Sequence, residues 1–381
     1  MTGPLAGIKV VELAGIGPGP MCAMLLADLG ATVIRVDRKQ PAKLGIERPL
    51  KYNTLLRNRG SVALDLKDRA AVDVVLGLVE QADALIEGFR PGVMERLGLG
   101  PEPCLQRNPR LAYGRLTGWG QHGPLAQAAG HDINYLALTG ILDAIGREGQ
   151  PPTMPLNFVG DYAGGSLYMA VGLLAAILEA RRSGQGQVVD AAIVDGATHL
   201  ASTFHGMLAG GLWQPGRGTN VSDGGSHFYD CYECADGRWI AVGPIEAKFF
   251  GELLQRLDID ATSLGPQLSR EHWKAAKAVL AARFKTRSRD EWANLLQHTD
   301  ACASPVLTFA EAPQHPHLRA RGTFVDIDGI LQAAPAPRFS RTVPPTPTPP
   351  LATTPENTDR TLSAWFAADK IATLRRAALI E

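Results

Sequence analysis

The apolar positions of the N-terminal half alternate between short continuous runs and longer segments with helical spacing. Residues 8–13 form an apolar run typical of a buried strand, and residues 21–29 then place apolar side chains on one helical face. Further strand-like runs follow at 31–36, 61–66, 84–87 and 188–194, with helical spacing over 70–81 and 167–182. This alternation predicts an α/β fold with a large, doubly wound, Rossmann-like domain built on a mostly parallel sheet.

The pattern changes in the C-terminal half. Strand-like runs at 226–233 and 238–243 flank the turn at 234–237, which predicts a hairpin, and three helical segments follow at 248–257, 270–284 and 289–298. We therefore predict a large α/β domain over 1–197, a linker over 198–224, a smaller α+β domain over 225–330, a Pro-rich linker over 331–355 and a C-terminal helix within 356–381 that returns to the large domain.

Composition narrows the classes of protein. The 381 residues are 45% hydrophobic and 20% charged, so the chain can bury a core. Lys plus Arg and Asp plus Glu both number 38, which disfavours a globally basic nucleic-acid-binding protein. The N-terminus lacks a basic region before an apolar run, and the apolar run at 169–178 is shorter than the roughly 20 residues that span a bilayer. We expect a cytoplasmic protein with no membrane partner.

A Gly/Pro-rich turn, Gly15–Pro20, joins the first predicted strand to the first predicted helix. Asp37 ends the next strand at the spacing that dinucleotide-binding folds use. Pro20 replaces the third glycine of that pattern, however, and Pro18 and Pro20 remove two N–H donors. A tight turn, or a turn that faces another ligand, is therefore favoured.

The pair Cys231 and Cys234 lacks a second pair of ligands, so we predict packing and no metal site.

Basic residues follow several of the predicted strands. They are Arg38, Arg57, Arg59, Lys67, Arg90 and Arg96. The carboxyl ends of parallel strands form the ligand crevice of such a sheet, and a guanidinium group binds two phosphate oxygens at once. The arrangement therefore predicts a phosphate-bearing ligand, although any one of these residues is also an ordinary surface charge.

Three residues are candidates for acid–base chemistry. His131 follows Gly130, Asp161 precedes a run of small residues at the start of a predicted helix, and Glu246 follows a strand of the smaller domain. Imidazole ionises near neutral pH, and a helix start offers N–H groups to an anion such as an enolate. Each residue alone also has an ordinary structural interpretation, as a core histidine or as a helix N-cap.

Several segments together resemble the family III CoA-transferase superfamily over nearly the whole chain. They are residues 5–13, 25–38, 57–59, 64–67, 89–93, 95–99, 118–124 and 161–165. The motifs Gly130-His131-Asp132 and Ile245-Glu246 resemble the racemase branch of that superfamily. The transferases typically lack the histidine and carry a glycine-rich loop at the second motif.

The resemblance implies an interlocked homodimer with an acyl-CoA substrate on the large domain and the active site at the border with the partner's small domain. It implies His131 and Asp161 as the two acid–base residues, with Glu246 as the partner of His131. It implies CoA contacts at Arg38, Leu64, Asp65, Leu66, Lys67, Gly88, Phe89, Arg90, Arg96, Gly130, Asp132, Ile133, Asn134 and Tyr135. No cofactor is expected beyond the CoA that is part of the substrate.

The implied reaction inverts the α-carbon of a 2-methyl-branched acyl-CoA. One group removes the α-proton, which leaves an enolate, and a group on the opposite face returns a proton. An aspartate ordinarily ionises near pH 3.9, so we expect burial to raise the pKa of Asp161 if it is to deliver a proton. Two alternatives stay open: CoA transfer with Asp161 as covalent nucleophile and, more remotely, a dinucleotide-dependent oxidoreductase.

Overall fold

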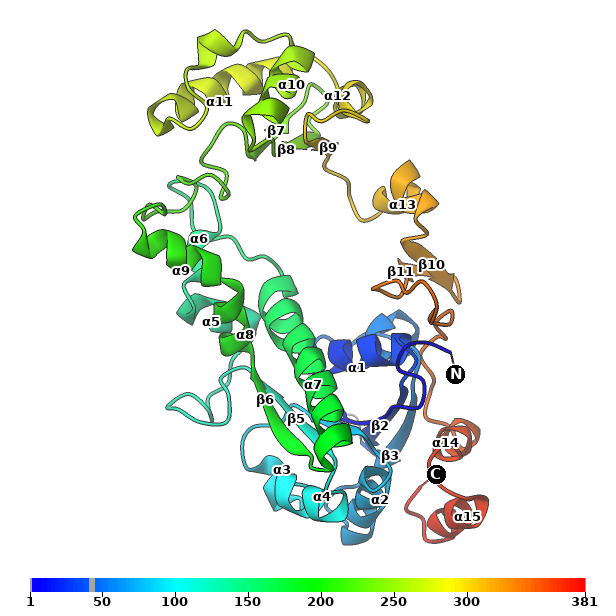
Figure 1. Cartoon of the computed structure of the whole chain (residues 1–381). Coiled ribbons are helices and arrows are strands. Elements are labelled where there is room, and N and C mark those ends of the chain that lie inside the picture. The colour runs from blue at the N-terminus through cyan, green and yellow to red at the C-terminus, as the bar shows by residue number, and fades with distance from the viewer. Residues whose placement is uncertain (1, 41–44, 381) are drawn as a thin grey trace. The chain divides into compact units, whose positions relative to one another are not determined.

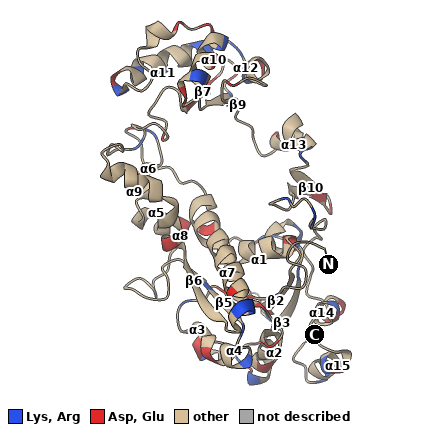
Figure 2. Cartoon of the chain, viewed as in Figure 1, with Lys and Arg blue, Asp and Glu red and all other residues tan. Residues whose placement is uncertain are grey.

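The computed structural model describes residues 2–40 and 45–380 and divides into two compact units (Figure 1). The first comprises Met1–Thr139, Leu156–Leu200 and Arg319–Glu381, and the second comprises Gly140–Pro155 and Ala201–Leu318. The predicted ranges differ from this division, because residues 140–155 belong to the second unit and residues 319–330 to the first. Lys and Arg are interspersed with Asp and Glu on the elements of both units (Figure 2).

A six-stranded sheet forms the centre of the first unit. Its strands are β1 (Lys9–Leu13), β2 (Thr32–Arg38), β3 (Gly60–Leu64), β4 (Ala84–Glu87), β5 (Ala112–Thr117) and β6 (Gln187–Ala192). They lie in the order β3-β2-β1-β4-β5-β6, and every pair is parallel. The order reverses between β1 and β4, and ligands of such sheets bind at the carboxyl ends of the strands beside that point. The predicted α/β fold is confirmed.

Helices cover both faces of this sheet. On one face α2 (Arg69–Val79), α3 (Val93–Arg96), α4 (Pro101–Arg107), α14 (Pro355–Leu362) and α15 (Ala368–Arg376) share a buried core with the sheet. On the other face α1 (Pro18–Asp28) and α7 (Tyr168–Ser183) do the same. The C-terminal segment was predicted as a single helix, but the structure has two. Residues 363–367 separate them, and Trp365 within that break is buried.

The segment before α7 is a π-helix, η3 (Phe158–Leu167), which runs directly into α7. Together they form a helical stretch of 26 residues that is long and apolar enough to cross a membrane by length and composition alone. Half of its most apolar window is buried within the unit, where Met169 and Leu173 pack against the sheet. The stretch is longer than the apolar run at 169–178 suggested, because small and polar residues continue the helix at its start.

Within the first unit, the side chain of Arg57 joins Asp28 to the returning C-terminal segment. The Arg57 guanidinium donates to both carboxylate oxygens of Asp28, at 3.1 and 2.5 Å, and both side chains are almost fully buried. Arg57 also donates to Gln332 Oε1 at 2.9 Å and to the Ala333 carbonyl at 2.7 Å, on β11 (Ile330–Ala333) of the hairpin that β10 (Phe324–Ile327) begins. The predicted phosphate role of Arg57 is therefore wrong, since its donors are used within the fold.

The second unit contains a small antiparallel sheet in the order β7-β8-β9. Its strands are β7 (Asp230–Glu233), β8 (Trp239–Val242) and β9 (Ala303–Pro305), and the first two form the predicted hairpin. Helices α10 (Ala247–Leu257), α11 (Arg270–Phe284) and α12 (Arg289–Leu296) share a buried core with it. The short helices α6 (Ile141–Ala144) and α9 (Ser202–Ala209) also belong to this unit.

We predict that Asp28→Ala lowers the free energy of unfolding by about 3–5 kcal/mol, because it leaves the Arg57 guanidinium buried without a counter-charge. The matched control is Lys51→Ala, which removes an exposed pair with Asp328 at 3.9 Å that also reaches the returning hairpin. Its expected cost is below about 1 kcal/mol. Urea denaturation measures both values, and similar losses for the two variants would contradict this assignment.

Candidate active site

A cleft of about 1160 Å³ lies in the first unit, on the side of the sheet where the strands end. The turn Gly15–Pro20, which follows β1, contributes four of its residues to the lining, and Arg35, Asp37 and Arg38 line the cleft from β2. His131, Asn157 and Tyr162 line it from outside the sheet. The cleft is therefore at the position where an open parallel sheet binds its ligand.

Asp161 lies in the first turn of η3 and is half-buried. Its Oδ2 is 3.2 Å from the position that a Cβ on Gly17 would occupy, so the carboxyl faces the Gly15–Pro20 turn. Burial, together with the charge of the nearby Asp132 carboxylate, raises the pKa of Asp161 to about 6. A hydrogen bond with the Asn157 side chain and the charge of His131 lower it. Near neutral pH this carboxyl is therefore present in both protonation states.

The predicted helix start at Asp161 needs correction. The π-helix begins at Phe158, so Asp161 is inside the helix and is not its N-cap. Its N–H donates to Asp132 Oδ1 at 2.6 Å and is not available to a bound anion. The glycines that follow have a packing role as well: a Cβ on Gly164 would lie 2.8 Å from the Ala197 nitrogen of α8 (Ile193–Leu200).

His131 is the residue before α5 (Asp132–Leu138), and its side chain is exposed. Its backbone N–H donates to Asn134 Oδ1 at 3.0 Å, which fixes the start of the helix. The charge of His131 acts on Asp161, so the structure brings together the two residues expected to carry acid–base chemistry. The sequence separates them by a loop that belongs to the second unit.

Tyr135 supports the turn in front of His131. Its ring is buried, packs edge-on against Trp119 at a centroid distance of 4.8 Å, and its hydroxyl donates to the Gly130 carbonyl. A Cβ on Gly118 would lie 2.0 Å from Tyr135 Cζ, which explains the glycine there. The Tyr135 side chain therefore has a supporting role, while Ile133 and Asn134 are exposed.

The predicted CoA contacts at the ends of β2 and β4 come together. The Arg38 guanidinium lies 5.9 Å from the centre of the Phe89 ring, and Arg38, Arg90 and Arg96 are exposed. The buried Glu87 carboxylate accepts the Phe89 N–H at 2.7 Å and pairs with Arg115 at 3.1 Å. Sequence reasoning missed this supporting pair, because nothing in the strand pattern separates a buried acid at a strand end from an exposed one.

Around β3 the predicted contacts are of two kinds. Leu64 is fully buried in the core, so only its backbone can face a ligand, and Leu66 packs partly on the same core. Asp65 and Lys67 are exposed, and the Lys67 N–H donates to Asp65 Oδ1 at 3.1 Å. Gly88, at the end of β4, is exposed as well, and a Cβ on it would lie 3.2 Å from the Leu116 carbonyl oxygen.

Arg59, like Arg57, is not a phosphate ligand. It is buried, pairs with the fully buried Glu12 at 3.1 Å and donates to the Pro20 carbonyl at 3.0 Å. Through these two contacts the Arg59 side chain connects the first turn of α1 to β1, and it thereby stabilises the turn that faces Asp161. The Arg35 guanidinium likewise donates to both oxygens of Asp37, at 3.0 and 3.1 Å. An acid engaged in this way is poorly suited to the ribose of a dinucleotide.

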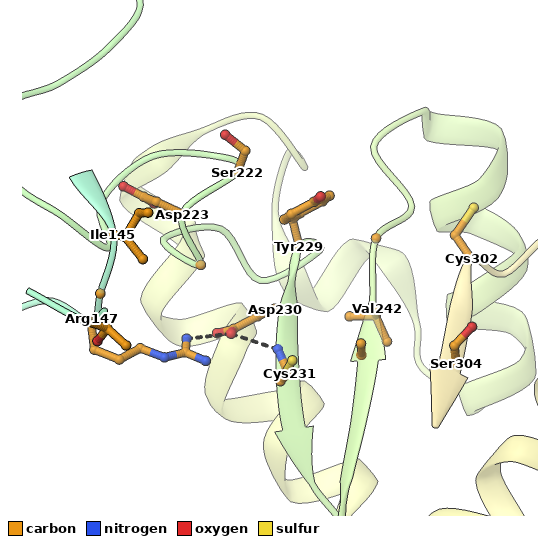
Figure 3. A pocket seen from close by; sticks show the side chains of 15 residues that line it. Ile145, Arg147, Ser222, Asp223, Tyr229, Asp230, Cys231, Val242, Cys302 and Ser304 are labelled. Atoms are coloured by element: carbon orange, nitrogen blue, oxygen red, sulfur yellow. Dashed lines mark hydrogen bonds and ion pairs between the residues drawn. The ribbon is translucent and has the colours of Figure 1, made fainter. Parts of the chain in front are cut away.

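Glu246 lies in the second unit, as the exposed residue before α10. The Gln267 side chain donates to the Pro244 and Ile245 carbonyls, both at 3.0 Å, and so fixes the turn that carries Glu246. A cavity of about 510 Å³ beside this turn is lined by Gly243, Tyr229, Val242 and Cys302 (Figure 3).

At the edge of the cavity shown in Figure 3, Arg147 pairs with Asp230 at 2.5 Å. Asp230 also accepts the Cys231 N–H and pairs with Lys277 at 2.7 Å, so this carboxylate is fully used within the unit. The Arg147–Asp230 pair therefore holds the loop at 145–147 against β7.

Residues 5–360 match the model of CoA-transferase family III. The chain belongs to this family. It is 46% identical to the alpha-methylacyl-CoA racemase of Mus musculus over 339 residues, which cover 89% of this chain and 87% of that protein. It is 45% identical to the alpha-methylacyl-CoA racemase of Homo sapiens over 321 residues, which cover 84% and 82% of the two chains. A crystal structure of a CaiB/BaiF family protein from Brucella suis has a TM-score of 0.81 at 27% identity and covers 96% of this chain and 100% of that one. The resemblance on which the sequence expectations depend is thus confirmed.

Proposed function

We propose that this chain is an α-methylacyl-CoA racemase that inverts the α-carbon of 2-methyl-branched acyl-CoA thioesters. The observation that carries the proposal is that His131 lies close enough to Asp161 for its charge to act on that carboxyl. The raised pKa of Asp161, about 6, lets it both accept and donate a proton near neutral pH. The identity to the racemases of mouse and human supports the same conclusion.

The proposed mechanism uses one group on each face of the α-carbon. In one direction neutral His131 takes the α-proton, the electron pair moves onto the thioester oxygen as an enolate, and protonated Asp161 delivers a proton to the opposite face. In the other direction the Asp161 carboxylate is the base and protonated His131 is the acid. The two directions leave the enzyme in opposite protonation states, and proton exchange with water restores it.

The CoA moiety is proposed to bind across the carboxyl ends of β2, β3 and β4. The exposed guanidinium groups of Arg38, Arg90 and Arg96 suit the phosphates of CoA, and Phe89 is held in place by the buried Glu87. Asp65, Lys67, Ile133 and Asn134 offer further exposed polar and apolar contacts. We propose that the reaction needs no cofactor besides the CoA of the substrate.

The proposed assembly is an interlocked homodimer located in the cytoplasm. The first unit contains both ends of the chain and the second is inserted between its parts, so the chain leaves the first unit and returns to it at Arg319. In the dimer, Glu246 of the partner subunit would face His131. A carboxylate in that position would orient the imidazole and stabilise its protonated form.

The first prediction follows a chiral 2-methylacyl-CoA in deuterated water. We expect α-deuterium to enter while the configuration inverts, because the returned proton comes from a group that exchanges with solvent. His131→Ala should slow inversion about 10²–10⁴-fold and leave residual exchange faster for one enantiomer. The control, His272→Ala, alters a half-exposed histidine on α11 of the second unit and should keep full activity.

CoA transfer between two carboxylic acids without α-proton exchange would overturn the racemase proposal. It would favour instead a transferase in which Asp161 attacks the thioester carbonyl and CoA thiolate leaves. Hydroxylamine trapping of the resulting aspartyl anhydride distinguishes that outcome from an inactive preparation.

The second prediction concerns CoA binding. Arg38→Ala should weaken binding of the acyl-CoA by roughly 1.5–3 kcal/mol, about 10- to 100-fold, because it removes a charge-assisted contact with phosphate. The control is Lys39→Ala, whose exposed ammonium group donates to the Ala378 carbonyl. Steady-state kinetics should show a raised KM with nearly unchanged kcat for Arg38→Ala alone. An equal rise in KM in the two variants would mean that any loss of positive charge weakens acyl-CoA binding, and it would contradict a specific contact at Arg38.

A further inference from the structure

The Asp132 carboxylate makes its contacts with the backbone of the turn that carries Asp161. Asp132 is 9% exposed, and its Oδ1 accepts the Asp161 N–H at 2.6 Å. The Gly160 backbone also hydrogen-bonds to the carboxylate. A Cβ on Gly160 would lie 2.3 Å from this Oδ1, so the approach is possible only because residue 160 is glycine. The sequence resemblance placed Asp132 among the CoA contacts, but its carboxylate is already occupied here.

The opposite side of η3 is fixed just as closely. A Cβ on Gly196 of α8 would lie 1.9 Å from the Gly164 carbonyl oxygen, so the backbones of the two helices are nearly in contact. The Ser166 hydroxyl donates to the Pro18 carbonyl at 2.8 Å and bonds η3 to the first turn of α1. With α5, α8 and α1 all attached to it, the Asp161 turn has little freedom to move.

Asp132 also directly follows His131 in the chain. The start of α5 therefore presents the histidine to the cleft and holds the backbone of Asp161 through the next residue. We propose, on the basis of the proposed racemase function, that Asp132 is a positioning residue, which fixes Asp161 relative to His131 and places a second negative charge beside the Asp161 carboxyl.

Few charged groups surround Asp161, so the effect of the Asp132 charge on the pKa of Asp161 can be measured separately. From α5, Asp132 raises its pKa, His131 lowers it, and the neutral Tyr135 lies close enough for its own pKa to be raised by both acids. The Gly15–Pro20 turn of α1 contains no ionisable side chain. Removal of the Asp132 charge should therefore lower the pKa of Asp161.

The test compares Asp132→Asn with Asp132→Ala in the full-length enzyme. Asparagine keeps a carbonyl oxygen that can accept the Asp161 N–H but removes the charge. When Asp161 acts as base, the rate rises with pH through its pKa; when it acts as acid, the rate falls through it. In Asp132→Asn we expect the rising limb of one direction and the falling limb of the other to move to lower pH by about 1 unit. The value of kcat at the pH optimum should be largely kept. Asp132→Ala should lose about 10- to 100-fold in kcat, because the turn is no longer fixed.

Asp73→Asn provides the matched control, because Asp73 is an exposed acid on α2 at the other face of the sheet. Its pH profiles should match those of the wild-type enzyme. Unchanged limbs in Asp132→Asn, with thermal unfolding and kcat both intact, would overturn the positioning role. So would a raised KM for acyl-CoA as the sole defect, which would return Asp132 to CoA binding. Absence of α-proton exchange in the wild type would instead refute the racemase function itself.

Discussion

The hydrogen bond between the Asp132 carboxylate and the Asp161 N–H is the contact on which the proposed active site depends. It joins the start of α5 to the first turn of η3, two segments between which the chain enters the second unit. A second hydrogen bond, from the Gly160 backbone to the same carboxylate, strengthens this link between α5 and η3. A carboxylate buried at this position also favours the protonated form of its neighbour, so one contact sets both geometry and proton affinity.

The doubly wound sheet makes this arrangement possible. The strand order reverses between β1 and β4, and the turn after β1 faces the Asp161 carboxyl. Arg59, paired with the buried Glu12, stabilises that turn by donating to the Pro20 carbonyl. The buried Glu87 stabilises the loop after β4 by accepting the Phe89 N–H. Buried charges therefore support these loops, while Arg38, Arg90 and Arg96 remain exposed.

The local elements of this chain could be predicted because their signals are local. The apolar run at 8–13 and the hairpin around the turn at 234–237 each appear in the structure close to their expected bounds. The tertiary partners could not be predicted in the same way. Arg57 and Arg38 look alike in the sequence, yet Arg57 is buried against Asp28 and Arg38 is exposed, because the partner of Arg57 lies on another element. Likewise, nothing local shows that Asp161 is inside a π-helix with its N–H already bound.

We expect the Asp161 carboxyl to be present in both protonation states near neutral pH because of where it is held. Its pKa can be measured directly by carbon NMR of the free enzyme labelled at the aspartate carboxyl carbons, with Asp161→Asn to assign the resonance. We expect one carboxyl resonance to titrate at about pH 6 in the wild type and to be missing from the variant. An Asp161 carboxyl that titrates below about pH 4, as an ordinary aspartate does, would contradict it.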